Sequence, residues 1–570
     1  MTNSPGESGC TIVVSFQIEY TETVRFHCFE CLPLCFTGRQ LKEGIHMNSD
    51  NTGISLIKKG KKSFLSLIFS RLGLILLLLL LQIGLLVAAF FWCEEFLPHI
   101  YSVAILFSVC MVLYLLNSRI DPTAKITWLV VIMLLPVFGA LLFLYTQRDI
   151  GHRALKAKAA QRVDESKDDL TQDPQVLKEL ELECPGAAGL AHYITRSGCY
   201  PVYKNSQVTY FPIGERKFTA MLKELEQAEH FIFMEYFIIH EGLMWGQILE
   251  ILARKASQGV DVRVMYDGTC ELSTLPHDYP ARLKKLGIQC KMFAPLSPFV
   301  STHYNYRDHR KILVIDGHTA FTGGINLADE YINHVERFGH WKDTAVMVKG
   351  DAVPSFTLMF LQMWSMDQRE TLDCGEFLSY PTNPPRDAEG FVIPYGDCPL
   401  DGDKVGEHVY IDILNRAGKY VHIMTPYLIL DGEMEDALKF AAKRGVDVKL
   451  ILPGIPDKFV PFSLALTHYR ALMDCGIEIY EYTPGFVHAK SFVSDDREGV
   501  VGTINLDYRS LYHHFECAAY QYGTSSIRDI EQDFQDTLKK CRRMTFQAIK
   551  LEKTSRKVVG VLVKALAPLL

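Results

Sequence analysis

Two segments of the 570-residue chain repeat the same spacing of a histidine, a lysine, an aspartate, a glycine and an asparagine. Both follow the pattern H-x-K-x4-D-x6-G-[GT]-x-N, and the asparagine follows the histidine by 17 positions in each copy. The polar residues are His309, Lys311, Asp316 and Asn326 in the first copy and His488, Lys490, Asp495 and Asn505 in the second. Two copies in register argue against a chance match.

The order of these residues predicts where their side chains point. Each histidine opens a β-branched, apolar run, and residues two apart on a strand share a face. His309 and Lys311 are therefore expected to point the same way, as are His488 and Lys490. The aspartates lie at an odd offset of seven, so they are expected to hold the local backbone. The glycines predict a tight turn that returns each asparagine beside its lysine.

An imidazole, a cation and an amide donor from each copy predict a symmetric clamp around one phosphodiester. One histidine would attack phosphorus and the other would shuttle a proton, with His309 weakly favoured as the nucleophile from its amino-terminal position. The lysines and asparagines would stabilise charge on the non-bridging oxygens. No acidic cluster suited to divalent ions is evident, so we expect neither a metal nor a cofactor. The alternative is two unrelated buried strands, although lysine is rarely buried unpaired.

These segments resemble the paired HKD motifs of the phospholipase D superfamily, and from about residue 98 onward the chain looks most like the bacterial cardiolipin synthases. The resemblance implies an α/β fold: a duplicated α/β sandwich that forms a pseudo-dimer, preceded by transmembrane helices. It implies the catalytic residues His309, Lys311, Asp316, His488, Lys490 and Asp495, and phosphate binding by Asn326 and Asn505.

Further acids fall at comparable places in the two copies. By resemblance, Asp343 and Glu516 would each accept a hydrogen bond from a catalytic histidine and fix its orientation; the alternative for each is an ordinary surface acid. Glu235 stands where the second copy has Thr425, so it would either make the site asymmetric or be a satisfied core carboxylate.

A longer repeat surrounds the motifs. Residues 230–239 parallel 420–429, and residues 258–264 parallel 444–450. Strands alternating with helices predict one mixed sheet per copy. The predicted domains are an extension unlike the family (1–46), a membrane region (47–150), a connector (151–205), the first phospholipase D-like domain (206–380), a Pro-rich linker (381–399) and the second such domain (400–570). The tail of the second domain is expected either to lie on an anionic membrane or to pack on the domain itself.

Three uncharged apolar stretches, at residues 72–93, 100–118 and 126–147, predict about three transmembrane segments. Basic residues flank both ends of this region, and three crossings cannot place both ends in the cytoplasm. We expect a multi-pass protein of the cell membrane with a cytoplasmic catalytic part. Translation is expected to start at Met47, and a zinc site at Cys28, Cys31 and Cys35 lacks a convincing fourth ligand.

The resemblance implies cardiolipin synthesis, in which one phosphatidylglycerol transfers its phosphatidyl group to another and glycerol leaves. The alternatives are a membrane-bound phospholipase D that hydrolyses phospholipid and a scaffold that only binds acidic lipid. A nuclease is disfavoured, because the net charge is -7 and no basic, aromatic-lined groove is apparent, so no nucleic-acid partner is expected. Candidates for an apolar rim that excludes water are Phe299, Phe459, Phe462 and Phe486, with a core role as the alternative for each.

Overall fold

The computed structural model describes residues 46–47, 53–56, isolated positions between 77 and 91, and residues 101–118, 120, 122–134, 136–147, 150–295 and 305–564. The predicted extension up to residue 45, the Cys28 cluster, most of the apolar stretch 72–93 and Phe299 lie outside the described residues.

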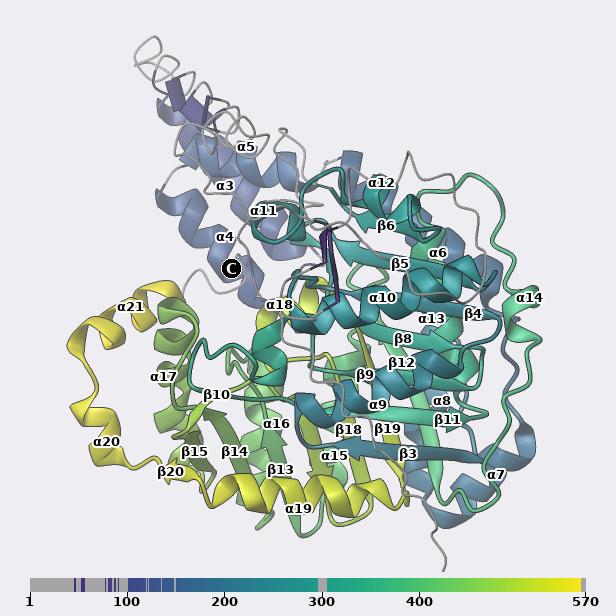
Figure 1. Cartoon of the computed structure of the whole chain (residues 1–570). Helices are drawn as coiled ribbons and strands as arrows, with labels where there is room; N and C mark the ends of the chain where they lie inside the picture. The colour runs from purple at the N-terminus through teal and green to yellow at the C-terminus, as the bar shows by residue number, and fades with distance from the viewer. Residues whose placement is uncertain are drawn as a thin grey trace, which may run out of the picture. The chain divides into compact units, whose positions relative to one another are not determined.

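The first copy of the repeat forms a seven-stranded mixed sheet (Figure 1). Its order is β3 (Ser206–Phe211), β11 (Ala345–Gly350), β9 (Thr319–Gly323), β8 (Lys311–Ile315), β4 (Phe231–Tyr236), β5 (Asp261–Asp267) and β6 (Gln289–Phe293). The associated helices are α9 (Gly214–Gln227), α10 (Leu243–Ser257), α11 (Cys270–Ser273), α12 (Tyr279–Lys284), η3 (Asp329–Ile332), α13 (Val353–Trp364) and α14 (Gly375–Leu378).

Both faces of this sheet are buried, and alternate residues of β4 show how. Ile232 and Met234 pack in a core with α9 and α10, which lie across one face of the sheet (Figure 1). Phe231 and Phe233 point to the opposite face, into a core that contains α13 and continues into the second copy. The two copies therefore share a hydrophobic core.

The second copy repeats the strand order and adds one strand, which confirms the duplication. Its order is β12 (Phe391–Asp397), β19 (His514–Tyr522), β18 (Glu498–Gly502), β17 (Ser491–Ser494), β13 (Tyr420–Met424), β14 (Asp447–Pro453), β15 (Glu478–Tyr482) and the additional β20 (Cys541–Arg543). Its helices are α15 (Val405–Arg416), α16 (Gly432–Lys443), α17 (Phe459–Met473), α18 (Tyr508–Tyr512) and α19 (Ser526–Leu538).

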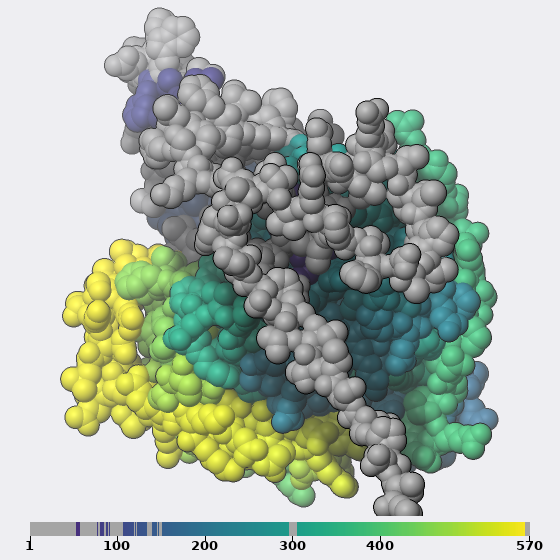
Figure 2. All heavy atoms as spheres, viewed as in Figure 1, coloured from purple at the N-terminus to yellow at the C-terminus, as the bar shows by residue number. Residues whose placement is uncertain are grey.

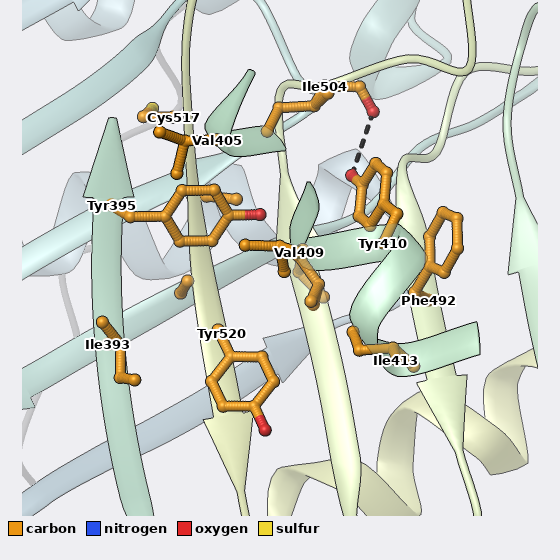
Figure 3. Close-up of a cluster of buried hydrophobic side chains, with 14 of the residues drawn as sticks. Ile393, Tyr395, Val405, Val409, Tyr410, Ile413, Phe492, Ile504, Cys517 and Tyr520 are labelled. Carbon is orange, nitrogen blue, oxygen red and sulfur yellow. Dashed lines mark hydrogen bonds between the residues drawn. The ribbon is translucent and has the colours of Figure 1, made fainter. Parts of the chain in front are cut away.

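Aromatic side chains fill the core of the second copy (Figure 3). The rings of Tyr410, from α15, and Phe492, from β17, stack with centroids 3.9 Å apart. The Tyr410 hydroxyl donates to the backbone carbonyl of Ile504, 3.2 Å away. Because Ile504 immediately precedes Asn505, this contact ties the end of the second motif to the core.

Two short parallel strand pairs join the copies. Strand β7 (Arg307–Asp308), just before His309, pairs with β19 of the second sheet. Strand β16 (Gly485–Val487), just before His488, pairs with β10 (His340–Lys342) of the first copy. The two pairs are equivalent under exchange of the copies, which gives the predicted pseudo-dimer its symmetry.

The connector forms three helices, α6 (Ile150–Ser166), α7 (Pro174–Glu183) and α8 (Pro185–Gly198). The predicted linker is shorter than expected, because residues 391–397 form β12. After α19 the chain forms α20 (Phe546–Leu551) and α21 (Thr554–Lys564). Helix α21 packs on α17, where a Cβ added to Gly560 would lie 2.2 Å from the carbonyl oxygen of Ser463. In Figure 2 the yellow carboxyl-terminal segment lies beside green atoms at the place where Figure 1 labels α17. Its residues Val558, Val561 and Leu562 are exposed.

The amino-terminal region contains β1 (His46–Met47), β2 (Ile54–Ser55), α3 (Tyr101–Asn117), α4 (Pro122–Leu134) and α5 (Pro136–Gln147). Within the part of the chain that the structure describes, none of the helices combines the length and apolar character needed to cross a bilayer. Leu56, next to β2, is buried in the core of the first copy, and its backbone N–H donates to Glu241.

Candidate active site

The two strand pairs between the copies bring each motif histidine beside an acid from the other copy. In the first pair Phe515 is opposite Asp308, so the next residues, Glu516 and His309, follow side by side. The backbone N–H of His309 continues the ladder by donating to the Phe515 carbonyl over 3.0 Å.

The second strand pair repeats this arrangement. Lys342 is opposite Val487, so Asp343 and His488 follow side by side. The His488 N–H donates to the Lys342 carbonyl over 2.7 Å. Backbone register therefore places both histidine–acid pairs.

The side chains complete these pairs. Nδ1 of His309 lies 2.9 and 3.0 Å from the two carboxylate oxygens of Glu516. Nδ1 of His488 lies 2.7 Å from Asp343. All four side chains are buried. Because Nδ1 faces the acid, Nε2 of each imidazole is the nitrogen left for substrate. These are the contacts that the resemblance implies, and the structure adds that each acid serves the histidine of the other copy.

The strands begin later than the sequence predicts. His309 precedes β8, which starts at Lys311, and His488 and Lys490 both precede β17, so the histidines lie in the short connections that follow β7 and β16. Each lysine folds back to its own histidine, where Nζ of Lys311 donates to the His309 carbonyl over 2.6 Å. Lys490 makes the equivalent bond to the His488 carbonyl and lies 2.9 Å from its Nδ1.

Both motif asparagines are buried and engaged locally. The Asn326 side chain accepts from the Ile238 N–H over 3.1 Å and donates to the Tyr331 hydroxyl over 2.8 Å. The Asn505 amide donates to Asp507 over 3.1 Å, while its carbonyl oxygen has no hydrogen-bond partner among the described residues. Phosphate binding by these amides stays a prediction.

The motif aspartates bind backbone N–H groups at a place that is separate from the imidazoles. Asp316 accepts from the N–H groups of residues 229, 230 and 231 over 2.7–2.8 Å, at the start of β4. Asp495 accepts from those of residues 418, 419 and 420 over 2.7–2.9 Å, at the start of β13. Both have positive φ, 49° and 54°. These contacts fit the positional role that the odd offset predicts, and a part in catalysis for either aspartate stays a prediction.

Burial sets the charges of the two histidines. It lowers the pKa of His309 well below its usual value, even though Glu516 acts in the opposite direction. Burial and the charge of Lys490 lower the pKa of His488 to about 4, against the effect of Asp343. Both imidazoles are therefore neutral in the free site near pH 7, each with Nδ1–H toward its acid.

The pKa values of the two lysines and of Glu516 are shifted as well. Burial lowers the pKa of Lys311 to about 8 and that of Lys490 to about 7, although the charges of Asp343 and Glu516 oppose the change. Both lysines feel the acids of both copies, so the charged groups converge on one region. For Glu516, burial favours the neutral acid, but the interaction with His309 and His514 holds the pKa of the carboxyl well below its usual range.

One motif position differs between the copies for a steric reason. The hydroxyl of Thr503 donates to Glu516. At the equivalent Gly324, an added Cβ would lie 2.0 Å from an oxygen of Asp343, so only glycine fits. This accounts for the alternation of Gly and Thr in the two motifs.

The sequence left two roles for Glu235, an asymmetric site residue or a core carboxylate. The structure buries the Glu235 side chain fully. Burial and the charge of Asp308 raise the pKa of Glu235 well above its usual value, against the effect of Arg310. Neither carboxylate oxygen of Glu235 has a hydrogen-bond partner among the described residues. Glu235 is therefore a buried core acid near Asp308 and makes no described contact with His309.

The predicted apolar rim is mainly core. Phe486 is buried against Trp341, with ring centroids 4.9 Å apart, and Phe462 is also buried, whereas Phe459 is about half exposed. Phe462 and Phe486 line a shallow hollow that Tyr427, Asp457 and Lys458 also border. This hollow lies next to the segment that carries His488.

Sequence analysis missed His514. It is buried beside His309, with ring centroids 5.2 Å apart. The available signal was parity, because a residue two before Glu516 on a strand shares its face.

A duplicated sheet that contributes one histidine–lysine pair from each copy defines a protein of the phospholipase D class. The family described as "Cardiolipin synthase, PLD-like domain" matches residues 221–364 and 410–538. A second family, "Phospholipase_D-nuclease N-terminal", matches residues 102–148, the region of α3 to α5.

Curated relatives cover most of the chain. A cardiolipin synthase of Halalkalibacterium halodurans is 32% identical over 511 residues, which is 88% of this chain and 100% of the relative. A cardiolipin synthase of Geobacillus thermodenitrificans is 33% identical, covering 83% of this chain and 94% of its own length. An uncharacterized protein of Streptococcus mutans is 59% identical over 80% of this chain and 99% of its own length. The chain belongs to the cardiolipin synthase family of the phospholipase D superfamily.

A solved structure supports the fold alone. The phosphatidylserine synthase of Haemophilus influenzae Rd KW20 superposes with a TM-score of 0.50 at 15% identity, over 64% of this chain and 93% of that one.

Proposed function

We propose that this protein is a cardiolipin synthase that transfers the phosphatidyl group of one phosphatidylglycerol to a second and releases glycerol. The observation that carries the proposal is the pair of cross-copy contacts, His309 with Glu516 and His488 with Asp343, around two buried lysines. Two oriented imidazoles are what a double displacement at phosphorus needs, whereas lipid binding alone needs neither.

In the first half-reaction, Nε2 of neutral His309 attacks phosphorus of the donor lipid and forms a P–N bond. The P–O bond to glycerol breaks, its electron pair stays on oxygen, and protonated His488 gives that oxygen its proton. Lys311 and Lys490 stabilise the charge on the non-bridging oxygens. The products of this step are free glycerol and a phosphohistidine.

In the second half-reaction, the hydroxyl of the acceptor phosphatidylglycerol loses its proton to His488, which is now neutral. The resulting oxygen attacks phosphorus, the P–N bond breaks, and His309 regains its electron pair. Cardiolipin is released and both histidines return to their starting states, so atoms and charge balance over the cycle.

The burial of the site explains how one histidine gains the proton. Both imidazoles are neutral in the free site, where buried positive charge from the lysines disfavours a further cation. An incoming phosphodiester brings a negative charge, which raises the pKa of the nearby imidazoles. Substrate binding thus supplies the protonated form of His488, and because the lysines provide the positive charge, the proposed reaction requires no metal.

Transfer instead of hydrolysis requires that a lipid hydroxyl reach the phosphohistidine before water does. A well-oriented acceptor gains an effective concentration of about 10⁵ M or more. The aromatic side chains of Tyr427, Phe462 and Phe486, beside the His488 segment, supply apolar surface next to the site. We further propose a multi-pass protein of the cell membrane with its catalytic part in the cytoplasm, which keeps the site at the lipid surface.

The test uses the purified full-length protein in phosphatidylglycerol vesicles, with products separated by mass. We expect glycerol and cardiolipin in equal amounts, little phosphatidic acid, undiminished activity in EDTA, and loss of most turnover in His488→Ala. Phosphatidic acid as the main product would make the protein a phospholipase D. Vesicle binding with neither product would favour the scaffold instead.

A further inference from the structure

The two halves of the site differ at one position beside the catalytic pairs. Two residues before the orienting acid, the first copy has Trp341 and the second has His514. Each lies against the histidine of the other copy: Trp341 is 5.6 Å from His488 and His514 is 5.2 Å from His309, between ring centroids. The half-site around His309 therefore holds an additional imidazole where the other half holds an indole.

His514 is buried without using its nitrogens. Its exposed fraction is 8%, and neither ring nitrogen has a hydrogen-bond partner in the part of the chain that the structure describes. Nδ1 lies 3.6 Å from Oε1 of Glu516, beyond hydrogen-bond distance. Phe237 packs on both His309 and His514, with centroids 4.9 and 6.3 Å away. A buried imidazole with unused nitrogens is costly unless it binds something.

We propose that His309, His514 and Glu516 form an inhibitory binding site for a divalent transition metal ion, with Zn²⁺ as the ion of best fit. One ligand atom from each residue lies within 4.8 Å of the other two. Ligands of a tetrahedral Zn²⁺ at about 2.0–2.1 Å are separated by about 3.3 Å. The distances of 2.9 Å from Glu516 to His309 and 3.6 Å from Glu516 to His514 bracket that value.

The donor set matches zinc in kind as well as in spacing. Two imidazoles and one carboxylate are a set that zinc enzymes use when the fourth position stays open. Here the carboxylate of Glu516 supplies the negative charge. Lys311, bonded to the His309 carbonyl, competes for the same charge and weakens the site, which suits reversible regulation more than permanent occupancy.

Metal binding at this place would stop catalysis. The ion would take the position of the proton on Nδ1 of His309, so the imidazole would no longer donate to Glu516. The displaced proton would move to Nε2, because a metal-bound imidazole carries its proton on the other ring nitrogen near neutral pH. Nε2 would then have no lone pair with which to attack phosphorus. No bond in the lipid is made or broken. The first half-reaction fails before phosphohistidine forms, while the other half-site, with Trp341, has no third ligand.

The experiment compares Zn²⁺ inhibition of the full-length protein in phosphatidylglycerol vesicles with that of His514→Gln, each relative to its own rate in chelator. The matched control is His422→Gln, which alters a buried histidine whose Nδ1 lies 2.9 and 3.0 Å from Glu531, remote from the motifs in sequence. We expect the half-inhibitory Zn²⁺ concentration to rise by at least about tenfold in His514→Gln and to stay unchanged in the control.

A second readout does not depend on activity. Co²⁺ added to the full-length protein is followed by its visible absorption, and the spectrum of His514→Trp, which copies the first half-site, is subtracted. A band in the difference spectrum that is typical of tetrahedral Co²⁺ with nitrogen and oxygen ligands would support the site. This result does not depend on the activity of a variant, nor on whether the lipid product agrees with the proposed function. The proposal would be overturned if Zn²⁺ inhibited wild type and His514→Gln equally. It would also be overturned if the Co²⁺ spectra of wild type and of folded His514→Trp were the same.

Discussion

His309 is held by Glu516, a carboxylate 207 positions further along the chain and in the other copy of the repeat. The reciprocal pair, His488 with Asp343, spans 145 positions in the opposite sense. Neither copy therefore contains a complete half-site, and the interface between the copies is itself part of the candidate active site.

This crossed arrangement predicts the effects of neutralising the acids. Asp343→Asn and Glu516→Gln keep the shape of the side chains but favour the wrong histidine tautomer, so each should lower kcat by about 10²- to 10⁴-fold with intact folding. Initial rates of glycerol release measure the loss. Glu531→Gln, beside His422, is the matched control and should stay within a few-fold of wild type. If Glu516→Gln behaved like that control, the orienting role would be wrong.

The lysines predict the alkaline limb of the pH profile. Their pKa values are lowered by burial to about 8 for Lys311 and about 7 for Lys490, so each is charged below that pH and loses its charge above it. Because kcat/KM reports the free enzyme, it should already decline with pH below 7 through the proton that His488 needs. We expect the loss of the lysine charges to steepen this fall, first above about pH 7 and again above about pH 8. The limb in kcat should lie at higher pH, because bound phosphodiester raises the pKa of both ammonium groups.

Measurement of both profiles between pH 5 and 10 checks this. In Lys490→Arg the guanidinium stays protonated, so the first part of the limb should move upward whatever the absolute rate. A profile of kcat/KM that stays flat to pH 9.5 would contradict the expected loss of charge.

The sequence predicted which residues meet at the candidate site better than it predicted how the chain connects them. Spacing alone identified His309, Lys311, His488 and Lys490, because their order is local. The crossed pairing was not predictable, because it depends on two- and three-residue strands, such as β7, whose partners are set by tertiary packing.

Domain edges were also missed for physical reasons. The prolines of the interdomain stretch indicated a linker, yet Pro394 lies inside β12. Proline lacks an N–H, but β12 is the first strand in the order of its sheet, and an edge strand tolerates a missing donor. His514 was overlooked because a single histidine in a strand is usually core, and only the cross-copy contact with His309 shows that it lies at the site.

The motif aspartates predict an effect on stability more than on chemistry. Asp316→Ala removes the acceptor of three backbone N–H groups and puts alanine at a φ of 49°, so unfolding should become easier by about 1–3 kcal/mol. Asparagine tolerates the left-handed φ and keeps one acceptor oxygen, so Asp316→Asn should lose less stability than Asp316→Ala. Thermal unfolding ranks the stabilities of wild type, Asp316→Asn and Asp316→Ala. A kcat of Asp316→Asn below one hundredth of wild type, with an unchanged Tm, would instead assign the aspartate to catalysis.

The last prediction concerns the side of the membrane on which the amino-terminal segment lies. Ser55 and Leu56 donate to the carboxylate of Glu241 over 2.6 and 2.8 Å, and a Cβ on Gly53 would lie 2.2 Å from the backbone of Gly246, so residues 53–56 dock on the first catalytic copy. Three crossings between this segment and α6 would put them on opposite sides. We therefore expect an epitope inserted ahead of Gly53 and one in the exposed turn at residues 401–403 to be reached by antibody in the same preparation, inverted vesicles, and to be protected together in intact cells. Accessibility of the two epitopes in opposite preparations would show that the docking does not form in the membrane.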